Sequence, residues 1–369
     1  MTQQTVRAAL AAVAVSFMFA GTTNLLAAQA PTGKNDSRAA IAASQTIPPG
    51  GINELKAVEL GGIKQWISVR GNDAANPLLL FIHGGPGSPM MGESWAFQRP
   101  WEDFFTVVQW DQRGAGKTFS AAHRKVDKSM SIERMQADAE ELVQLLRESY
   151  GKKKIFLLGH SWGSVLGVRV AQHRPEWLYA YIGVGQVVNM QKNEAVGYEL
   201  TLEQARAQKN VAAIKELESI APYPRPDGTI SINSTAVERK WDVAFGGMLY
   251  GQQQDDEHQR WAMSPMYTDY DVKSAELGEE STVGVLWPQL GDVSFDAVSG
   301  FECPVFIFAG AHDRTTPTTL AKQFFDRISA PEKKFFEIQR AAHYVFDEAP
   351  GEFLLDLVTE VRPLSEHAE

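Results

Sequence analysis

The feature that most constrains this chain is a serine framed by glycines, Ser161, which stands between an apolar run and a helix-like segment. The apolar run covers Lys154–Leu158, and the segment Val165–His173 has apolar residues at helical spacing. Between them residues 159–163 read Gly-His-Ser-Trp-Gly. In a sharp strand-to-helix turn, a side chain at either glycine would collide with the neighbouring elements. The pattern predicts a turn that sets the Ser161 hydroxyl at a helix N-terminus, where backbone N–H groups favour negative charge.

Strand-like and helix-like segments alternate on both sides of this turn. A hairpin is predicted at 55–60 and 63–69, further strands at 78–82, 105–110, 154–158, 179–184, 304–308 and 335–338, and helices after Ser131 and at 165–173, 320–328 and 351–361. Continuous apolar runs such as Leu78–Ile82 suit strands that are buried on both faces. The alternation predicts the α/β class, a mostly parallel central sheet with helices on both faces.

The alternation breaks at about Val187 and resumes at Pro304. The residues between are polar and helix-rich, with a proline-rich loop at 222–226. We therefore expect a helical cap domain over 187–300, inserted into a catalytic domain that covers 51–186 and 301–369.

The N-terminus is typical of a secretory signal. Arg7 is the only charged residue in the first thirty, an apolar stretch covers Ala8–Ala20, and Ala28-Gln29-Ala30 is a small-x-small cleavage site. We predict a signal peptide over 1–30, cleaved after Ala28 or Ala30, a flexible linker over 31–50, and a periplasmic or secreted protein. An uncleaved anchor or an apolar helix of the fold is the alternative. The single cysteine, Cys303, permits no internal disulfide.

A serine becomes a good nucleophile only beside a base that is itself oriented. Asp313 follows the predicted strand 304–308, and His343 follows the strand 335–338. Parallel α/β sheets place their sites at such carboxyl ends, and the chain order serine, acid, histidine is the order that this kind of turn requires. We expect His343 to take the Ser161 proton and Asp313 to hold the imidazole.

Other residues compete for these roles. Asp313 could instead cap the next helix, and His343 could be an ordinary loop histidine. The remaining candidates are His83, His160, His173 and His312 as bases, and Asp292, Asp296 and Asp347 as acids.

A glycine-rich loop after the third predicted strand supplies a candidate oxyanion hole. Residues 83–87 read His-Gly-Gly-Pro-Gly, and glycines let a backbone approach a substrate oxygen closely. The predicted donors are the N–H of Trp162 and one N–H of this loop, for which Gly84 and Gly85 are the candidates. The alternative is a tight turn that binds nothing.

Together, residues 83–87, the Asp-Gln-Arg-Gly-Ala-Gly run at 111–116 and residues 159–164 resemble the proline iminopeptidase family of α/β-hydrolases. The resemblance covers about Gly51 to His343 without the cap. It implies the α/β-hydrolase fold, a triad of Ser161, Asp313 and His343, an oxyanion hole at Gly85 and Trp162, and release of N-terminal proline from peptides. It also implies that Asp111 and Arg113 brace a loop beside the site.

The sequence departs from the family at His160, where the family has glycine, and at Lys117-Thr118, where it has Arg-Ser. The family holds the substrate's free amine in an acidic pocket, largely in the cap. By resemblance, Glu194, Glu238 and Asp242 are the substrate-binding candidates, and Glu199 is a further cap acid. Charges on a helical cap are more often solvated.

The net charge of −10 disfavours nucleic acid and anionic membranes as partners. There is no Cys/His cluster, and acyl transfer needs no cofactor or metal, so we expect none. The expected partner is a small molecule or a short peptide, with no stable membrane association after signal cleavage. An esterase, amidase or lactonase acting on small acyl substrates is the alternative, and a non-catalytic ligand-binding protein is a more remote one. The oligomeric state is left open.

Overall fold

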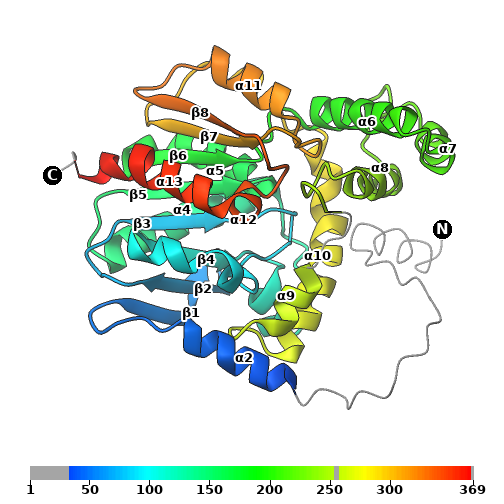
Figure 1. Ribbon diagram of the computed structural model, residues 1–369. Helices are drawn as coiled ribbons and strands as arrows, with labels where there is room; N and C mark the ends of the chain where they lie inside the picture. Colours follow the sequence, from blue (N-terminus) through cyan, green and yellow to red (C-terminus); the bar gives the residue numbers. More distant parts are fainter. Residues whose placement is uncertain (1–32, 253–256, 367–369) are drawn as a thin grey trace.

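The computed structural model describes residues 33–252 and 257–366, so the predicted signal peptide lies outside the described residues. Within these ranges eight strands form one sheet in the order β1-β2-β4-β3-β5-β6-β7-β8 (Figure 1). The strands are β1 (Ile52–Leu60), β2 (Ile63–Gly71), β3 (Leu78–Ile82), β4 (Thr106–Asp111), β5 (Ile155–His160), β6 (Leu178–Val184), β7 (Val305–Gly310) and β8 (Lys333–Ile338). The pairs β1–β2 and β2–β4 are antiparallel, whereas every later pair is parallel.

The central strands are buried on both faces because two apolar cores sandwich the sheet. In β3, Leu78, Leu80 and Ile82 belong to one core, and Leu79 and Phe81 belong to the other. This alternation follows from the two-residue period of a strand. The continuous apolar runs in the sequence therefore reflect two-sided burial. The predicted α/β class, with a mostly parallel sheet and helices on both faces, is confirmed.

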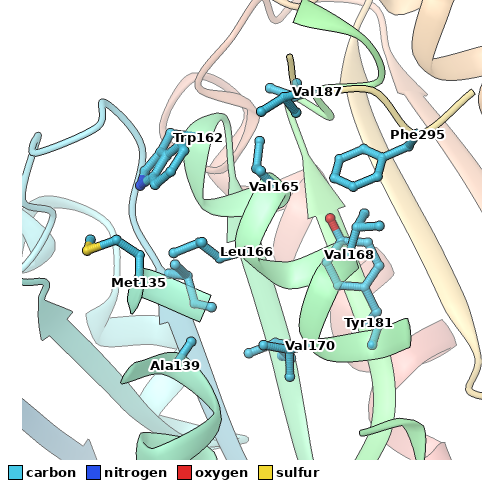
Figure 2. Packing of buried hydrophobic residues seen from close by; sticks show 14 of the residues in the cluster. Met135, Ala139, Trp162, Val165, Leu166, Val168, Val170, Tyr181, Val187 and Phe295 are labelled. Carbon is cyan, nitrogen blue, oxygen red and sulfur yellow. The ribbon is translucent and has the colours of Figure 1, made fainter. Parts of the chain in front are cut away.

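Helices α4 (Ile132–Ser149), α5 (Trp162–His173) and α11 (Thr318–Arg327) contribute to the first core. Helix α4 begins where the sequence predicts, because the Ser131 side chain accepts a hydrogen bond from the Arg134 amide. Figure 2 shows the packing of α5 with Met135 and Ala139 of α4. The other described elements outside the insertion are α3 (Gly116–Ala121), α12 (Val345–Glu348), α13 (Pro350–Asp356), the 3-10 turns η1 (Ser94–Ala96), η2 (Arg99–Asp103), η3 (Pro175–Trp177) and η5 (Arg362–Ser365), and the π-helical turn η4 (Leu357–Val361).

Between β6 and β7 the chain forms a helical insertion, a name used here for the described residues of 187–300. Its helices are α6 (Met190–Ala207), α7 (Val211–Ser219), α8 (Ile232–Ala244), α9 (Glu257–Met263) and α10 (Asp269–Leu290). They gather at one end of the sheet (Figure 1). That end is the carboxyl end of the parallel strands, because the Thr315 hydroxyl, just after β7, donates to Asp242 of α8.

The segment expected to be a linker differs in the structure. Residues 33–44 form helix α2 (Gly33–Ser44), which is rich in alanine, the best helix former. Its Arg38 Nε donates to the carbonyl of Ala262 at 3.0 Å, and its guanidinium pairs with Asp269 at 2.9 Å. These contacts to the insertion give the segment a fixed place that composition alone does not reveal. None of the helices in the described part of the chain is long and apolar enough to cross a membrane.

Candidate active site

Ser161 occupies the sharp turn between β5 and α5 that the sequence predicts. Its φ of 54° lies in the left-handed region, which is strained for a residue with a side chain. A Cβ on Gly159 would lie 2.5 Å from the carbonyl oxygen of Gly163, and a Cβ on Gly163 would lie 2.0 Å from that of Ile82. Both glycines are therefore required by the close approach of backbone. Ser161 stays partly exposed, whereas its neighbours His160 and Trp162 are buried.

The structure brings Asp313 and His343 together at the ends of β7 and β8. The Nδ1–H of His343 donates to Oδ2 of Asp313 at 2.8 Å, and both side chains are buried. Because the carboxylate fixes the proton on Nδ1, Nε2 is left with its lone pair. The backbone N–H and the hydroxyl of Thr316 donate to the two oxygens of Asp313, each at 2.8 Å.

The end of β6 lies next to both Ser161 and His343. The Ser161 N–H donates to the carbonyl of Val184 at 2.9 Å. The next residue, Gly185, lies so close to the His343 ring that a Cβ there would be 2.8 Å from Cε1. The predicted nucleophile, base and acid therefore lie at the carboxyl ends of β5, β8 and β7.

The glycine loop after β3, residues 83–87, lies beside Ser161. A Cβ on Gly84 would lie 3.1 Å from the Cβ of Ser161, so this loop passes directly beside the serine. Gly85, the next residue of this loop, has a φ of +107° and is exposed. Trp162 is the first residue of α5, so its N–H belongs to the unpaired first turn of that helix. Gly84 and Trp162 are thus adjacent to Ser161, and Gly85 follows Gly84 in the same loop.

Gln112 ties the glycine loop to the elbow, a role that the sequence analysis missed. Its backbone N–H donates to Nε2 of His83, and its side-chain amide donates to the His83 carbonyl at 3.0 Å. Its side-chain oxygen accepts from the indole N–H of Trp162 at 3.1 Å. Burial lowers the pKa of His83 to about 4, so this histidine is neutral near pH 7.

Asp111 and Arg113 are structural, as the resemblance implies. Arg113 is buried and its Nε pairs with Asp138 at 2.8 Å. Asp111 accepts from the hydroxyl of Tyr267 at 2.6 Å and from the Lys117 amide at 2.7 Å. Burial raises the pKa of Asp111 to about 7. The two side chains hold the loop after β4 against α4 and against the segment that precedes α10.

Most of the competing histidines and acids contact other residues, and Asp292 is exposed. His173 is exposed and pairs with Glu140, and His312 is exposed and stacks on Tyr250. Asp347 pairs with Arg260, and Asp296 pairs with Lys192. His160 is buried, and its Nε2 lies 3.1 Å from the His343 carbonyl oxygen.

The acidic candidates of the insertion are buried, in contrast to the exposed Glu199. Arg239 pairs with both Glu194 and Glu238, and the hydroxyl of Tyr223 also donates to Glu194. Burial raises the pKa of Glu238 to about 7. These two acids are therefore already partnered by an arginine of the insertion itself.

Among the acidic candidates of the insertion, Asp242 contacts the loop that follows β7 and carries Asp313, which we call the acid loop. Its Oδ2 accepts from the Thr315 hydroxyl at 3.0 Å, whereas its buried Oδ1 has no hydrogen-bond partner and lies 3.8 Å from Arg314. Burial raises the pKa of Asp242 to about 6. Across the described ranges, no group of His, Cys, Asp and Glu side chains could hold a metal ion.

The chain is similar in sequence and in fold to several known proteins. The model of the alpha/beta hydrolase fold matches residues 77–350. A probable aminopeptidase of Bacillus subtilis is 32% identical over 315 residues, which cover 84% of this chain and 96% of that protein. A proline iminopeptidase of Neisseria meningitidis is 26% identical over 310 residues, which cover 79% and 91%. The solved structure of a Mycobacterium smegmatis proline iminopeptidase has a TM-score of 0.59 at 20% identity, covering 86% of this chain and 100% of that one.

The fold and the matched family model define a hydrolase built on a mostly parallel α/β sheet. The chain belongs to the alpha/beta hydrolase fold family, and its resemblance to the proline iminopeptidases is confirmed by these relatives.

Proposed function

We propose that this protein is a serine hydrolase that releases N-terminal residues, proline above all, from small peptides through an acyl-enzyme. The observation that carries the proposal is the 2.8 Å bond between His343 and Asp313, set against the same β6 end that holds the strained Ser161. A buried base oriented by a carboxylate beside an elbow serine has the arrangement of a nucleophile–base–acid triad.

The mechanism follows from these positions. Nε2 of His343 takes the Ser161 proton as Oγ attacks the scissile carbonyl, and Asp313 stabilises the imidazolium. The N–H groups of Gly85 and Trp162 receive the developing oxyanion, and removal of one such donor typically costs about 3–4 kcal/mol of barrier stabilisation. His343 then protonates the leaving amine. Water activated by the same imidazole hydrolyses the ester on Ser161.

Aminopeptidase specificity requires recognition of a free amine. The relatives named as aminopeptidases motivate this part of the proposal. Glu194, Glu238 and Asp242 supply negative potential above the site, and Arg239 offsets part of it. We assign direct amine contact to Asp242, because its buried Oδ1 has no hydrogen-bond partner and the residue adjoins the acid loop.

A substrate panel tests the proposal. Purified enzyme is assayed on aminoacyl-arylamides, prolyl-arylamide first, and on short acyl esters and lactones, with Ser161→Ala as the inactive control. We expect prolyl-arylamide to be cleaved, and Asp242→Asn to reduce this cleavage while it spares simple esters. Hydrolysis of esters or lactones with no arylamide cleavage would favour an esterase or lactonase and sink the aminopeptidase assignment. If a fluorophosphonate does not label Ser161 in folded protein, the protein is a ligand-binding member of this fold.

We also propose that residues 1–30 are a signal peptide and that the mature protein is periplasmic or secreted. The support is the single charge, the apolar stretch and the Ala-Gln-Ala site in this segment.

A further inference from the structure

The loop that carries His343 has no regular structure of its own, since it lies between the end of β8 and the start of α12. Its backbone is fixed by one carboxylate. The N–H groups of Ala342 and Tyr344, which flank His343, both donate to Oε2 of Glu348, at 3.0 and 2.9 Å. A single oxygen thus holds the chain on both sides of the candidate base.

The other oxygen of Glu348 reaches the helical insertion. Oε1 accepts a hydrogen bond from the backbone N–H of Tyr250, in the segment that follows α8. The same segment makes two further backbone contacts, from the N–H of His343 to the Met248 carbonyl at 3.1 Å and from the N–H of Arg314 to the Gly247 carbonyl at 3.2 Å. We call residues 247–250 the bridging segment, because it contacts the acid loop, the base loop and Glu348 in succession.

The surroundings of His343 include four other titratable groups, one of which is Tyr344, whose ring centroid lies 5.5 Å from that of His343. Asp313 approaches from the end of β7, and His160 at the end of β5 has its ring centroid 4.8 Å from that of His343. Glu348 approaches from α12. Burial raises the pKa of Glu348, whereas its backbone donors and the charge of His343 act in the opposite direction.

We propose that Glu348 is a positioning residue for His343, and that it couples the base to the helical insertion through the N–H of Tyr250. The role rests on the proposed function, because it concerns His343 as a base. A displacement of the bridging segment, such as one caused by a substrate bound under the insertion, is transmitted by Glu348 to the backbone on both sides of His343. Glu348 itself contacts no reacting atom in this scheme.

The carboxylate is required because both of its oxygens accept. Glutamine has nearly the same shape, but one end of its amide is an NH₂ group that can only donate. Whichever way the amide turns, this group faces a backbone N–H. Glu348→Gln therefore breaks either the clamp on the base loop or the link to the bridging segment, and it removes the negative charge near His343.

The test measures the rate of fluorophosphonate labelling of Ser161 as a function of pH. The variant is Glu348→Gln, and Glu352→Gln is the matched control, an exposed glutamate at the start of α13. We expect roughly 10- to 100-fold slower labelling in Glu348→Gln, which is the loss that a displaced catalytic group produces. We also expect the midpoint of its pH profile to move to lower pH, because the imidazolium loses a nearby negative charge. Glu352→Gln should match the wild type.

A second pair of variants tests the coupling without altering Glu348. Tyr250→Pro removes the N–H donor, whereas Tyr250→Ala keeps the donor and removes only the ring that stacks on His312. We expect slower labelling in Tyr250→Pro than in Tyr250→Ala, and equal rates would overturn the coupling. Wild-type rate and profile in folded Glu348→Gln would overturn the positioning role. If wild-type Ser161 is not labelled at all, the proposed function fails, and the NMR titration of the His343 ring in the same variants still tests the influence of Glu348.

Discussion

Gly185→Ala should damage the base far more than the fold. Gly185 has a φ of +55°, and an alanine Cβ there would lie 2.8 Å from Cε1 and 2.9 Å from Nδ1 of His343. Carbon atoms in contact normally lie about 3.5–4.0 Å apart, so the ring must move by roughly 1 Å. Such a shift takes Nδ1 away from Asp313 and Nε2 away from Ser161. A misplacement of about 1 Å can lower a rate by about 100-fold.

The cost to stability is smaller. Placing alanine at positive φ costs roughly 1–2 kcal/mol. The matched control is Gly284→Ala in α10, where an added Cβ meets no atom within 4 Å. In a helix this change should stabilise by up to about 1 kcal/mol. Urea unfolding gives both stabilities, and fluorophosphonate labelling of Ser161 gives the rates.

The result that refutes the reasoning is a labelling rate equal to that of the wild type in a folded Gly185→Ala protein. That outcome would mean that the His343 ring has room to move, or that its place against Gly185 does not matter for proton transfer. If the variant is also much less stable, partial unfolding could lower its labelling rate. The rates are therefore compared at a temperature well below the melting temperature of the variant.

Three further predictions concern the triad, acid stability and export. Asp313→Asn should lower kcat by roughly 10⁴, the typical effect of this change in a Ser-His-Asp triad, because the amide favours the wrong tautomer of His343; a loss below tenfold in steady-state assays would argue against the triad. His83 has a pKa of about 4 when folded and an ordinary value of 6.5, so the unfolded chain binds its proton first and stability falls as the pH drops through that window. Between pH 7 and pH 5 this group should cost about 2 kcal/mol of stability, which urea unfolding at those two pH values measures, with His83→Asn expected to be less acid-sensitive. Finally, mass spectrometry of the exported protein should find an N-terminus just after Ala28 or Ala30. Protein from the periplasmic fraction that still begins at Met1 would contradict cleavage.

The strands and the candidate triad could be predicted because they depend on local patterns. Apolar runs mark two-sided burial, and parallel strands end at the same edge, so residues directly after β5, β7 and β8 must lie close together. Asp313 and His343 could thus be selected without any contact being known. Gly84 and Gly85 were found for the same reason, since their loop follows β3.

Residues that act through the backbone could not be predicted in this way. Gln112 and Glu348 hold loops by bonds to backbone N–H and carbonyl groups, and Thr316 donates its own N–H to the Asp313 carboxylate. The sequence does not encode the paths of those loops directly. The same holds for Glu194, whose partner Arg239 lies on another helix of the insertion. Helix α2 was missed because its place depends on docking to α9 and α10 rather than on its own composition.

The position of β7 and β8 in the chain has a consequence for biosynthesis. Strand β6 pairs with β7 across the whole insertion, so the sheet is completed only when the last part of the chain arrives. A nascent or truncated chain that stops before Val305 carries the serine elbow but lacks Asp313 and His343. Because synthesis runs from the N-terminus, the proposed triad can form only after the chain has been made as far as His343. If the protein is exported unfolded, activity would then first arise on the far side of the membrane.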